Sequence, residues 1–333
     1  MKPTNDVMVN KNKQIAVLTV SYNHEKWIAQ CIESVLAQEC SMPVVQYIWD
    51  DNSPDSTFDI AQQYQQRYPE RIVIFKQPAN RGAANNYFDC LTTILQNPQN
   101  EYIAWLDGDD YWCDTKHLQE KTAYLNQNPD CGIVHSNIYI LHTNGKQSVV
   151  GKTTENTPSG FIMDKMLMRP LFSALTIVLR ASLLADLPID ELRPLPLQTI
   201  DHILEVWICS KSKAVFMESA TGVWRRHKHT ISTSNNLQTA LRWIDHECAQ
   251  HEWIVRHFPN SVLAKVDLKY HRDNMQFNAY FAAGEYKKAK EIISRNSRAG
   301  EYAPKYAKII KKGPIYFYAY RILRYIKNRI SIN

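Results

Sequence analysis

The most informative absence in this 333-residue sequence is that of any long hydrophobic run. No apolar stretch approaches the roughly 20 residues that a helix needs to cross a lipid bilayer. The first residues, "MKPTNDVMVNKNKQ", lack the apolar segment of a secretory signal peptide. We therefore expect a cytoplasmic protein, whose 44% hydrophobic and 22% charged residues are ordinary for a globular chain with a sizeable core.

Signals for several common cofactors and partners are also missing. The sequence has no G-x-G-x-x-G dinucleotide fingerprint and no phosphate-binding P-loop. Its seven cysteines are odd in number and no pair has the spacing of metal ligands, so we expect reduced thiols. The net charge of +6 is too small to indicate nucleic acid, and we expect no nucleic-acid partner.

Apolar runs and helical patterns alternate along the first part of the chain. The runs typical of buried strands are residues 15–23, 44–50, 72–77 and 102–106, and the helical patterns are 24–38, 60–68 and 83–95. This alternation predicts an α/β sheet with parallel strands. Further along, 132–141 and 174–180 indicate strands and 199–210 a helix, and from about residue 236 the pattern is helical, with two helices around Gly284.

Polar clusters follow the predicted strands. They read "SYNH", "DDNSPDST", "NRG" and "DGDD", in chain order. In open α/β sheets ligands bind beyond the carboxyl ends of the strands, so we expect these clusters to lie along one edge and form the site.

The "DGDD" cluster carries the strongest chemical signal. Asp107 and Asp109 lie two residues apart and face the same way on an extended chain, and Asp110 adds a third carboxylate. Such an oxygen-rich group suits Mg²⁺ or Mn²⁺ that also binds substrate phosphates. The alternative is a solvated turn that caps the next helix.

Other polar residues are open to two interpretations. Asp50 and Asp51 either form a βα loop or accept hydrogen bonds from a base or ribose. Gly82 allows a ligand to approach the backbone closely. Asp201 is either the N-cap of a helix or a general base. The segment "WRRHKHTIS", residues 224–232, is either a basic surface loop or a diphosphate clamp with an imidazole metal ligand.

Taken together and in this order, the motifs resemble those of glycosyltransferase family 2, the inverting nucleotide-sugar transferases. The resemblance covers roughly residues 14–233 and rests on "VLTVSYNHEKWIAQCIESVLAQ", "IWDDNSPDST", "NRGAANNY", "YIAWLDGDDYW" and "GVWRRHKHTIS". It implies the GT-A fold, a Rossmann-like mixed sheet flanked by helices, with a C-terminal helical extension. The domains expected are a flexible N-terminus (1–13), a GT-A domain (14–235, with a nucleotide-sugar half 14–130 and an acceptor half 131–235) and a helical region (236–333).

The resemblance also implies roles for individual residues. Asp51, with Asp50 beside it, matches the acid that holds the base or ribose, and Asp201 sits where the family carries its catalytic base. Two positions depart from the family's patterns: Ile200 precedes Asp201 in place of the usual Glu, and Trp224 replaces Tyr in the Tyr-Arg-x-His motif of His227. The residues implied to bind the nucleotide sugar are Thr19, Ser21, Tyr22, Asp50, Asp51, Asn80, Gly82, Asn86, Asp107, Gly108 and Arg225, and those implied to bind metal are Asp109, Asp107 and His227.

The implied function is a metal-dependent inverting transfer of a hexosyl or N-acetylhexosaminyl group. Mn²⁺ or Mg²⁺ is the expected cofactor, a UDP-sugar the favoured donor, and a glycan or lipid-linked glycan the acceptor, in synthesis of capsule, O-antigen or lipopolysaccharide. A nucleotidyltransferase is an alternative, although "SYNHEKW" lacks the glycine that its loop would need. A non-catalytic binding protein on the same fold is another.

Acidic residues are absent after Glu301, which makes the end of the chain basic. Within "GPIYFYAYRILRYIKNRISIN", one helical stripe holds Ile315, Tyr318, Ile322, Tyr325 and Ile326, and basic residues lie off it. The stripe indicates either a packed helix or a helix that lies on an anionic membrane surface, which predicts a peripheral location at the inner face of the cell membrane.

Overall fold

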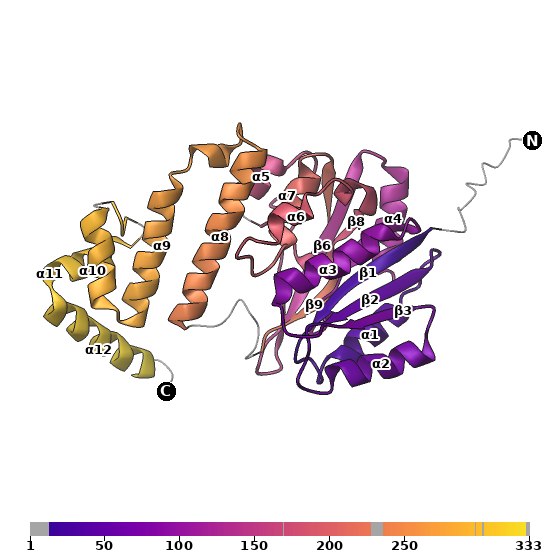
Figure 1. Ribbon diagram of the computed structural model, residues 1–333, viewed down its shortest axis with the longest axis horizontal. Helices are drawn as coiled ribbons and strands as arrows, with labels where there is room; N and C mark the ends of the chain where they lie inside the picture. The colour runs from indigo at the N-terminus through magenta and orange to yellow at the C-terminus, as the bar shows by residue number, and fades with distance from the viewer. Residues whose placement is uncertain (1–12, 169, 228–235, 297, 302, 331–333) are drawn as a thin grey trace, which may run out of the picture. The chain divides into compact units, whose positions relative to one another are not determined.

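The computed structural model describes residues 13–168, 170–227, 236–296, 298–301 and 303–330. These residues divide into two compact units (Figure 1). Unit 1 holds the described residues up to Pro194 together with Thr199–His227, and unit 2 holds Leu195–Gln198 and the described residues from 236 onward. The expected flexible N-terminus falls largely on residues 1–12, which lie outside the described part, as do Lys228 and His229 of the basic segment.

Unit 1 is built around a mixed sheet whose strand order is β3-β2-β1-β4-β8-β6-β9-β5, with β7 paired to β6. The strands are β1 (Gln14–Ser21), β2 (Val44–Asp50), β3 (Ile72–Lys76), β4 (Asn100–Trp105), β5 (Tyr111–Trp112), β6 (Cys131–Leu141), β7 (Gln147–Val149), β8 (Val178–Arg180) and β9 (Lys213–Arg225). The first four are parallel to one another, which confirms the four strands predicted from apolar runs. β1 and β2 read as continuous apolar runs because almost every residue in them is buried.

Helices cover both faces of the parallel strands (Figure 1). α1 (Ile28–Leu36) and α2 (Thr57–Arg67) share one apolar cluster with β2 and β3, formed by Ile28, Ile32, Ile48, Ala61 and Ile72. α3 (Ala83–Gln96) packs on β1 and β2, and α4 (His117–Gln127) packs on β6. The predicted α/β alternation is confirmed. Because β1, β2 and β4 are parallel, the loops that follow them meet at one edge of the sheet.

The second half of unit 1 corrects one strand prediction. Residues 174–180 were expected to form one strand, but Ala174–Thr176 is a 3-10 helix and only Val178–Arg180 is extended. The cause is the Thr176 hydroxyl, which accepts a hydrogen bond from the Ser136 amide on β6 at 3.1 Å, the place a strand carbonyl would take. β9 is a single strand with a register shift at Glu218 and Ser219, where β6 skips two residues of its partner.

The remaining helices of unit 1 are short. They are α5 (Met163–Met168), α6 (Ile189–Leu192) and α7 (Asp201–Cys209). α7 confirms the helix predicted at 199–210, and its buried residues include Ile203 and Val206. Its N-cap is Ile200, with no side-chain capping hydrogen bond, so the interpretation of Asp201 as an N-cap is wrong.

Unit 2 is helical, as predicted. It contains α8 (Leu237–His257), α9 (Leu268–Ala283), α10 (Tyr286–Arg295), α11 (Pro304–Lys312) and α12 (Pro314–Ile330). Gly284 ends α9 with a left-handed φ of 93°, a conformation that favours glycine, and confirms the predicted turn between two helices. None of the helices within the described residues is long and apolar enough to cross a membrane.

Candidate active site

The site begins where three parallel strands end. Ser21 of β1 pairs with Asp50 of β2, and Leu18 of β1 pairs with Trp105 of β4. The chain beyond β4 continues beside β1, because the amide of Gly108 donates to the carbonyl of Val20 at 3.0 Å. The "SYNH", "DDNSPDST" and "DGDD" loops therefore lie together at one edge, as their positions in the sequence predicted.

Asp50 is a structural acid of this edge. It is fully buried, and its carboxylate accepts hydrogen bonds from the amide and hydroxyl of Ser53, at 2.8 and 2.5 Å, and from the Ser21 hydroxyl at 3.2 Å. These donors tie the loop after β2 to the end of β1. Asp50 thus stabilises these two loops, and its oxygens are already used in hydrogen bonds within the protein.

Asp51 organises the neighbouring "NRG" loop. Its carboxylate accepts the backbone amides of Arg81 and Gly82 at 2.7 and 2.9 Å. Burial raises the pKa of Asp51, and the two amide hydrogen bonds oppose that rise. Asn80 lies exposed in the same loop, and its side chain accepts from the Gly82 amide at 3.3 Å. Gly82 has a φ of 82°, so this turn requires the conformational freedom of glycine.

Asn86 braces the framework of the site. It is buried in α3, where its amide group donates to the carbonyl of Trp49 at 2.7 Å and accepts from Gln77 at 3.1 Å. Both ends of the side chain are thus used between α3 and β2. Thr19 is similarly buried, and its hydroxyl accepts from Gln46 at 3.0 Å. Tyr22 is different: it is 45% exposed at the end of β1, where a ligand can reach it.

Asp107 lies at the inner end of the aspartate cluster. Its carboxylate accepts the Tyr87 hydroxyl at 2.6 Å. Burial raises the pKa of Asp107 to about 7, and the negative charges of Asp109 and Asp201 add to that rise. The charge of Asp201 therefore acts on Asp107 although the two residues come from different halves of unit 1.

Asp109 faces two imidazoles. Its Oδ2 atom lies 2.8 Å from Nε2 of His227 and 3.8 Å from Nε2 of His24. Burial on its own would raise the pKa of Asp109, but the two histidines hold it below the usual value. The His227 ring stacks on Trp27 with 4.1 Å between ring centres, which orients its nitrogen toward the carboxylate. The predicted pairing of Asp109 with His227 thus appears as a direct contact.

Asp110 and Arg225 stabilise the loop that carries Asp109. Asp110 is buried and accepts the backbone amide of Arg225 at 2.8 Å, and burial followed by the charge of Asp109 raises its pKa well above the ordinary value. The Arg225 guanidinium donates to the carbonyl of Asp109 and to the Gln30 side chain, and it lies over the Tyr111 ring at 4.7 Å. Arg225 is therefore a positioning residue for the "DGDD" loop in this structure, not an open diphosphate clamp.

Gly108 fills a tight space between these groups. A Cβ atom at this position would lie 2.9 Å from Nδ1 of His24 and 3.0 Å from Cβ of Ser21. No larger residue fits unless the His24 ring moves. The glycine in the middle of the D-x-D element thus allows Asp107 and Asp109 to approach the end of β1.

Asp201 lies in the first turn of α7 and is partly exposed. Glu205 follows four residues later, one helical turn along the same face, and is buried. Burial raises the pKa of Glu205 well above the ordinary value, and the Asp201 charge raises it further. Asp201 is thus the partly exposed carboxylate of this pair, and its charge also raises the pKa of Asp107.

The donor set suits a divalent cation only if a ligand supplies further groups. Among the residues that the structure describes, no group of three or more His, Cys, Asp or Glu side chains is arranged to hold a metal ion. Two ligands at about 2.1 Å from one octahedral ion are about 3 Å apart. The 2.8 Å between Asp109 Oδ2 and His227 Nε2 matches that edge. These two residues fit the ion, and diphosphate oxygens and water would complete its shell.

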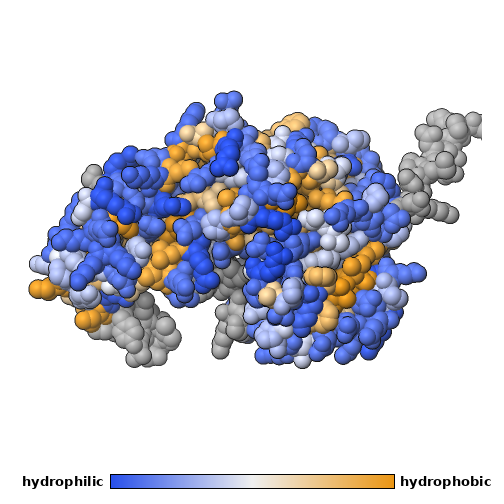
Figure 2. Space-filling model, viewed as in Figure 1, coloured by the Kyte–Doolittle hydropathy of each residue, from blue (hydrophilic) through white to orange (hydrophobic). Residues whose placement is uncertain are grey.

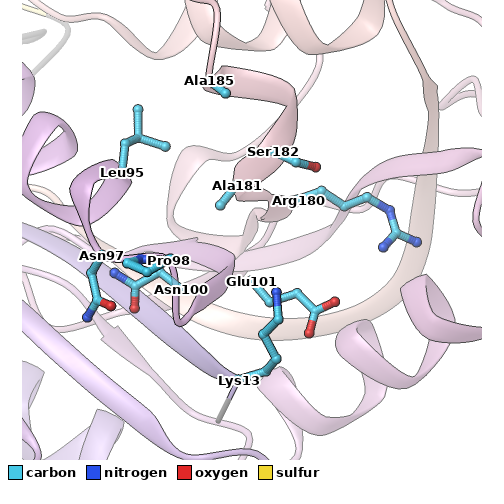
Figure 3. A pocket seen from close by; sticks show the side chains of 10 residues that line it. All are labelled: Lys13, Leu95, Asn97, Pro98, Asn100, Glu101, Arg180, Ala181, Ser182 and Ala185. Atoms are coloured by element: carbon cyan, nitrogen blue, oxygen red, sulfur yellow. The ribbon is translucent and has the colours of Figure 1, made fainter. Parts of the chain in front are cut away.

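A separate cleft of about 360 Å³ lies at the opposite end of the strands (Figure 3). Lys13, Asn100 and Glu101 line it where β1 and β4 begin, together with Arg180. The Arg180 guanidinium already donates to the carbonyls of Cys131 and Leu125, at 2.9 and 2.6 Å. This cleft has no carboxylate–imidazole group, and we do not assign the chemistry to it.

Sequence reasoning missed three contributors to the site: His24, Trp27 and Tyr87. His24 and Trp27 lie in the first loop and its helix start, and burial lowers the pKa of His24. A signal was present, because both rings follow a strand end within "SYNHEKW". Tyr87 follows Asn86 in α3, and nothing local to the sequence indicates that its hydroxyl reaches Asp107.

Comparisons with known proteins bear on the family and the fold. The model of the family described as "Glycosyl transferase family 2" matches residues 16–174. The putative teichuronic acid biosynthesis glycosyltransferase TuaG of Bacillus subtilis is 30% identical over 173 residues, which cover 52% of this chain and 64% of TuaG. The chain spans about 60% of the length of three uncharacterised mycobacterial proteins, to which it is 27% identical over 221 residues.

Solved structures share the fold. S. aureus TarS 1–349 in complex with UDP-GlcNAc is similar with a TM-score of 0.53 and 16% identity, over 92% of this chain and 91% of that one. The mannosyltransferase PcManGT of Pyrobaculum calidifontis, in complex with GDP-Man and Mn²⁺, is similar with a TM-score of 0.53 and 15% identity, over 93% and 86%. The protein thus has the predicted GT-A fold, and its residues 16–174 match the model of glycosyl transferase family 2.

Proposed function

We propose that this protein is an inverting glycosyltransferase of the cytoplasm. It transfers a hexose or N-acetylhexosamine from a nucleotide-diphosphate sugar, with UDP favoured, to a hydroxyl group of a glycan or lipid-linked glycan during synthesis of a surface polysaccharide. The observation that carries the proposal is the 2.8 Å contact of Asp109 with His227 at the strand edge, with the charge of Asp201 acting on Asp107 nearby. The similarity to the putative glycosyltransferase TuaG, and to TarS and PcManGT with their bound nucleotide sugars, supports transfer of a sugar from a nucleotide sugar.

Each part of the site has its own role in this reaction. The strand-end loops organised by Asp50 and Asp51 receive the nucleotide, with exposed Tyr22 as a surface for the base. Asp109 and His227 would hold a divalent cation, which would supply positive charge against the leaving diphosphate. A site built from carboxylate oxygen and imidazole nitrogen favours Mn²⁺ over Mg²⁺.

Asp201 acts as the general base from the acceptor half, residues 131–235. Its carboxylate takes the proton of the acceptor hydroxyl while that oxygen forms a bond to C1 of the sugar. The bond from C1 to the diphosphate oxygen breaks in the same step, and the nucleoside diphosphate leaves with the electron pair. Attack from the face opposite the leaving group inverts the anomeric centre.

The direct test measures nucleoside diphosphate released from a panel of UDP-, dTDP- and GDP-sugars, with Mn²⁺, with Mg²⁺ and with a chelator. Because a general base typically contributes about 10²–10⁴-fold, Asp201→Asn should lose that much of kcat and keep donor binding. Asp190 is the matched control, since it also lies in the first turn of a helix and is exposed. Asp190→Asn should keep the wild-type rate.

Asp109→Asn tests the cation site. It should weaken Mn²⁺-dependent binding of the nucleotide, followed by calorimetry, and abolish turnover, because the remaining protein ligand is a single imidazole. Full activity of either Asp109→Asn or Asp201→Asn would overturn the role of that residue. Release of pyrophosphate instead of a nucleoside diphosphate would point to a nucleotidyltransferase, and an inactive wild type that still binds the nucleotide would point to a binding protein.

A further inference from the structure

The last helix of unit 2 has one face fixed against its neighbours. Phe317 of α12 is fully buried in an apolar cluster with Phe277, Phe281 and Ile310. Arg321, one turn later, donates to the carbonyl oxygens of Phe281 and Ala282 at 2.9 and 2.6 Å. Those carbonyls belong to the last turn of α9, where a cation is favourable. Phe317 and Arg321 thus determine which face of α12 is turned outward.

The outward face is apolar. Ile315 is 82% exposed, Ile322 59% and Leu323 66%, and the Tyr316 and Tyr318 rings are more than half exposed. Figure 2 shows hydrophobic side chains, in orange, at the surface around α11 and α12. The alternative that the stripe through Ile315, Tyr318 and Ile322 is packed inside the protein is therefore wrong for these three residues. The side chains of Tyr325 and Ile326 lie outside the described part.

Exposed cations flank this apolar face. Lys308, Lys311 and Lys312 of α11 are exposed, and Lys312 lies 5.3 Å above the ring of Tyr316. The sequence adds Arg324, Lys327 and Arg329 in α12 and contains no acidic residue after Glu301. Together, α11 and α12 carry exposed apolar side chains, aromatic rings and positive charge, and their sequence contains no acidic residue. This composition is typical of a helix that lies in the interface of an anionic bilayer.

We infer that α11 and α12 form a docking surface for an anionic lipid membrane. α12 is 17 residues long, about 25 Å, and lies along the surface with Ile315, Ile322 and Leu323 in the acyl boundary. The lysines of α11 contact the anionic headgroups. An enzyme that acts on a lipid-linked acceptor, as proposed above, would thereby be held at the membrane that carries the acceptor. The docking surface itself is inferred from the residues of α11 and α12 and does not depend on that reaction.

The test is sedimentation of the full chain with vesicles of phosphatidylcholine alone or with added phosphatidylglycerol. The wild type should bind the anionic vesicles at least about tenfold more tightly. Ile315→Asp/Ile322→Asp should lose most of that binding, and Lys308→Gln/Lys311→Gln should lose about 25-fold, since each basic residue near the surface contributes about fivefold. Thermal unfolding should be unchanged because none of the four side chains is buried.

Matched controls come from unit 1. Phe161→Asp/Val149→Asp removes two apolar side chains that are 73% and 54% exposed, and Lys116→Gln/Lys146→Gln removes two exposed charges. Both controls should bind as the wild type does. Wild-type binding that is absent, equal on the two vesicle types, or as sensitive to the controls as to the α11 and α12 variants would overturn the inference. So would a change of oligomeric state by light scattering in Ile315→Asp/Ile322→Asp, which would assign the face to a protein partner.

Discussion

A buried lysine behind the aspartate loop provides a quantitative test of the structure. Lys121 of α4 is 1% exposed, and no carboxylate contacts its ammonium group. Its Nζ atom lies 2.9 Å from Nδ1 of His117 and donates to the Thr221 hydroxyl at 3.2 Å. The His117 ring stacks on Trp112 with 4.3 Å between centres, immediately after the "DGDD" loop. Replacing Lys121 by methionine, of similar shape, removes only the ionisable group.

The magnitude follows from the pKa. Burial lowers the pKa of Lys121 to about 7 from 10.5, opposed by the more distant charges of Asp114 and Glu120. Between these two values the unfolded chain binds a proton that the folded protein lacks, so the free energy of unfolding rises with pH. From about pH 7 to about pH 9 this group should add about 2 kcal/mol of stability, which is lost again as the pH falls.

The assay is urea unfolding of the wild type and of Lys121→Met at about pH 7 and about pH 9, followed by tryptophan fluorescence. Other groups titrate in this range, Asp107 among them, but they contribute equally to both proteins and cancel in the difference. Burial is the larger cause that lowers the pKa of His117 below the ordinary value, and it is present in both proteins, so His117 should not interfere. The wild type should gain about 2 kcal/mol more than the variant between the two pH values.

Lys116 of the same segment is exposed and serves as the control, since Lys116→Met should leave the pH dependence unchanged. A pH dependence shared by wild type and Lys121→Met to within about 0.5 kcal/mol would mean that Lys121 stays charged when folded. The burial of this lysine behind the site would then be refuted.

Two further predictions concern the site itself. Gly108→Ala should lower the free energy of unfolding by about 1–3 kcal/mol, measured in urea, because its Cβ would meet His24 and Ser21; an unchanged value would mean that the loop has more room than the structure gives it. Glu205→Gln should keep kcat near pH 7 within about twofold, measured by nucleoside diphosphate release, because burial raises the pKa of this carboxyl well above its ordinary value and so disfavours its charge; a loss of tenfold or more would show that its charge is needed.

Much of the fold could be predicted because the parallel strands are buried on both faces. β1 and β2 appear as unbroken apolar runs, and each ends in polar residues that the topology brings together. The prediction failed where tertiary contacts decide the local structure. The Thr176 hydroxyl accepts the Ser136 amide of β6, where a carbonyl of the neighbouring strand would otherwise accept it, and residues 174–176 are a 3-10 helix instead of a strand.

The site was predictable as a location but not as a division of roles. The residues whose side chains meet there are far apart in the chain, such as Asp109 and His227, which are 118 residues apart. Tyr87 was missed because nothing local to the sequence indicates that its hydroxyl reaches Asp107, whereas His24 lies in a polar strand-end cluster that the sequence shows but whose contact with Asp109 it does not. Arg225 was expected at the diphosphate, yet its guanidinium holds Gln30 and the Asp109 carbonyl.

The hydrogen-bond partners of the acids explain why one strand edge carries so many of them. Asp50, Asp51 and Asp110 accept backbone amides of their own or neighbouring loops, and each such bond replaces the water that a buried carboxylate loses. Asp109 faces imidazoles instead, and Asp201 reaches solvent. Acids satisfied by the backbone keep the loops in place, whereas acids that the backbone leaves unsatisfied have oxygens for a cation or a proton. Asp107 accepts the Tyr87 hydroxyl instead of a backbone amide, so one of its oxygens is also occupied. We therefore assign the cation to Asp109 and the proton to Asp201, and the other carboxylates build the pocket in which these two act.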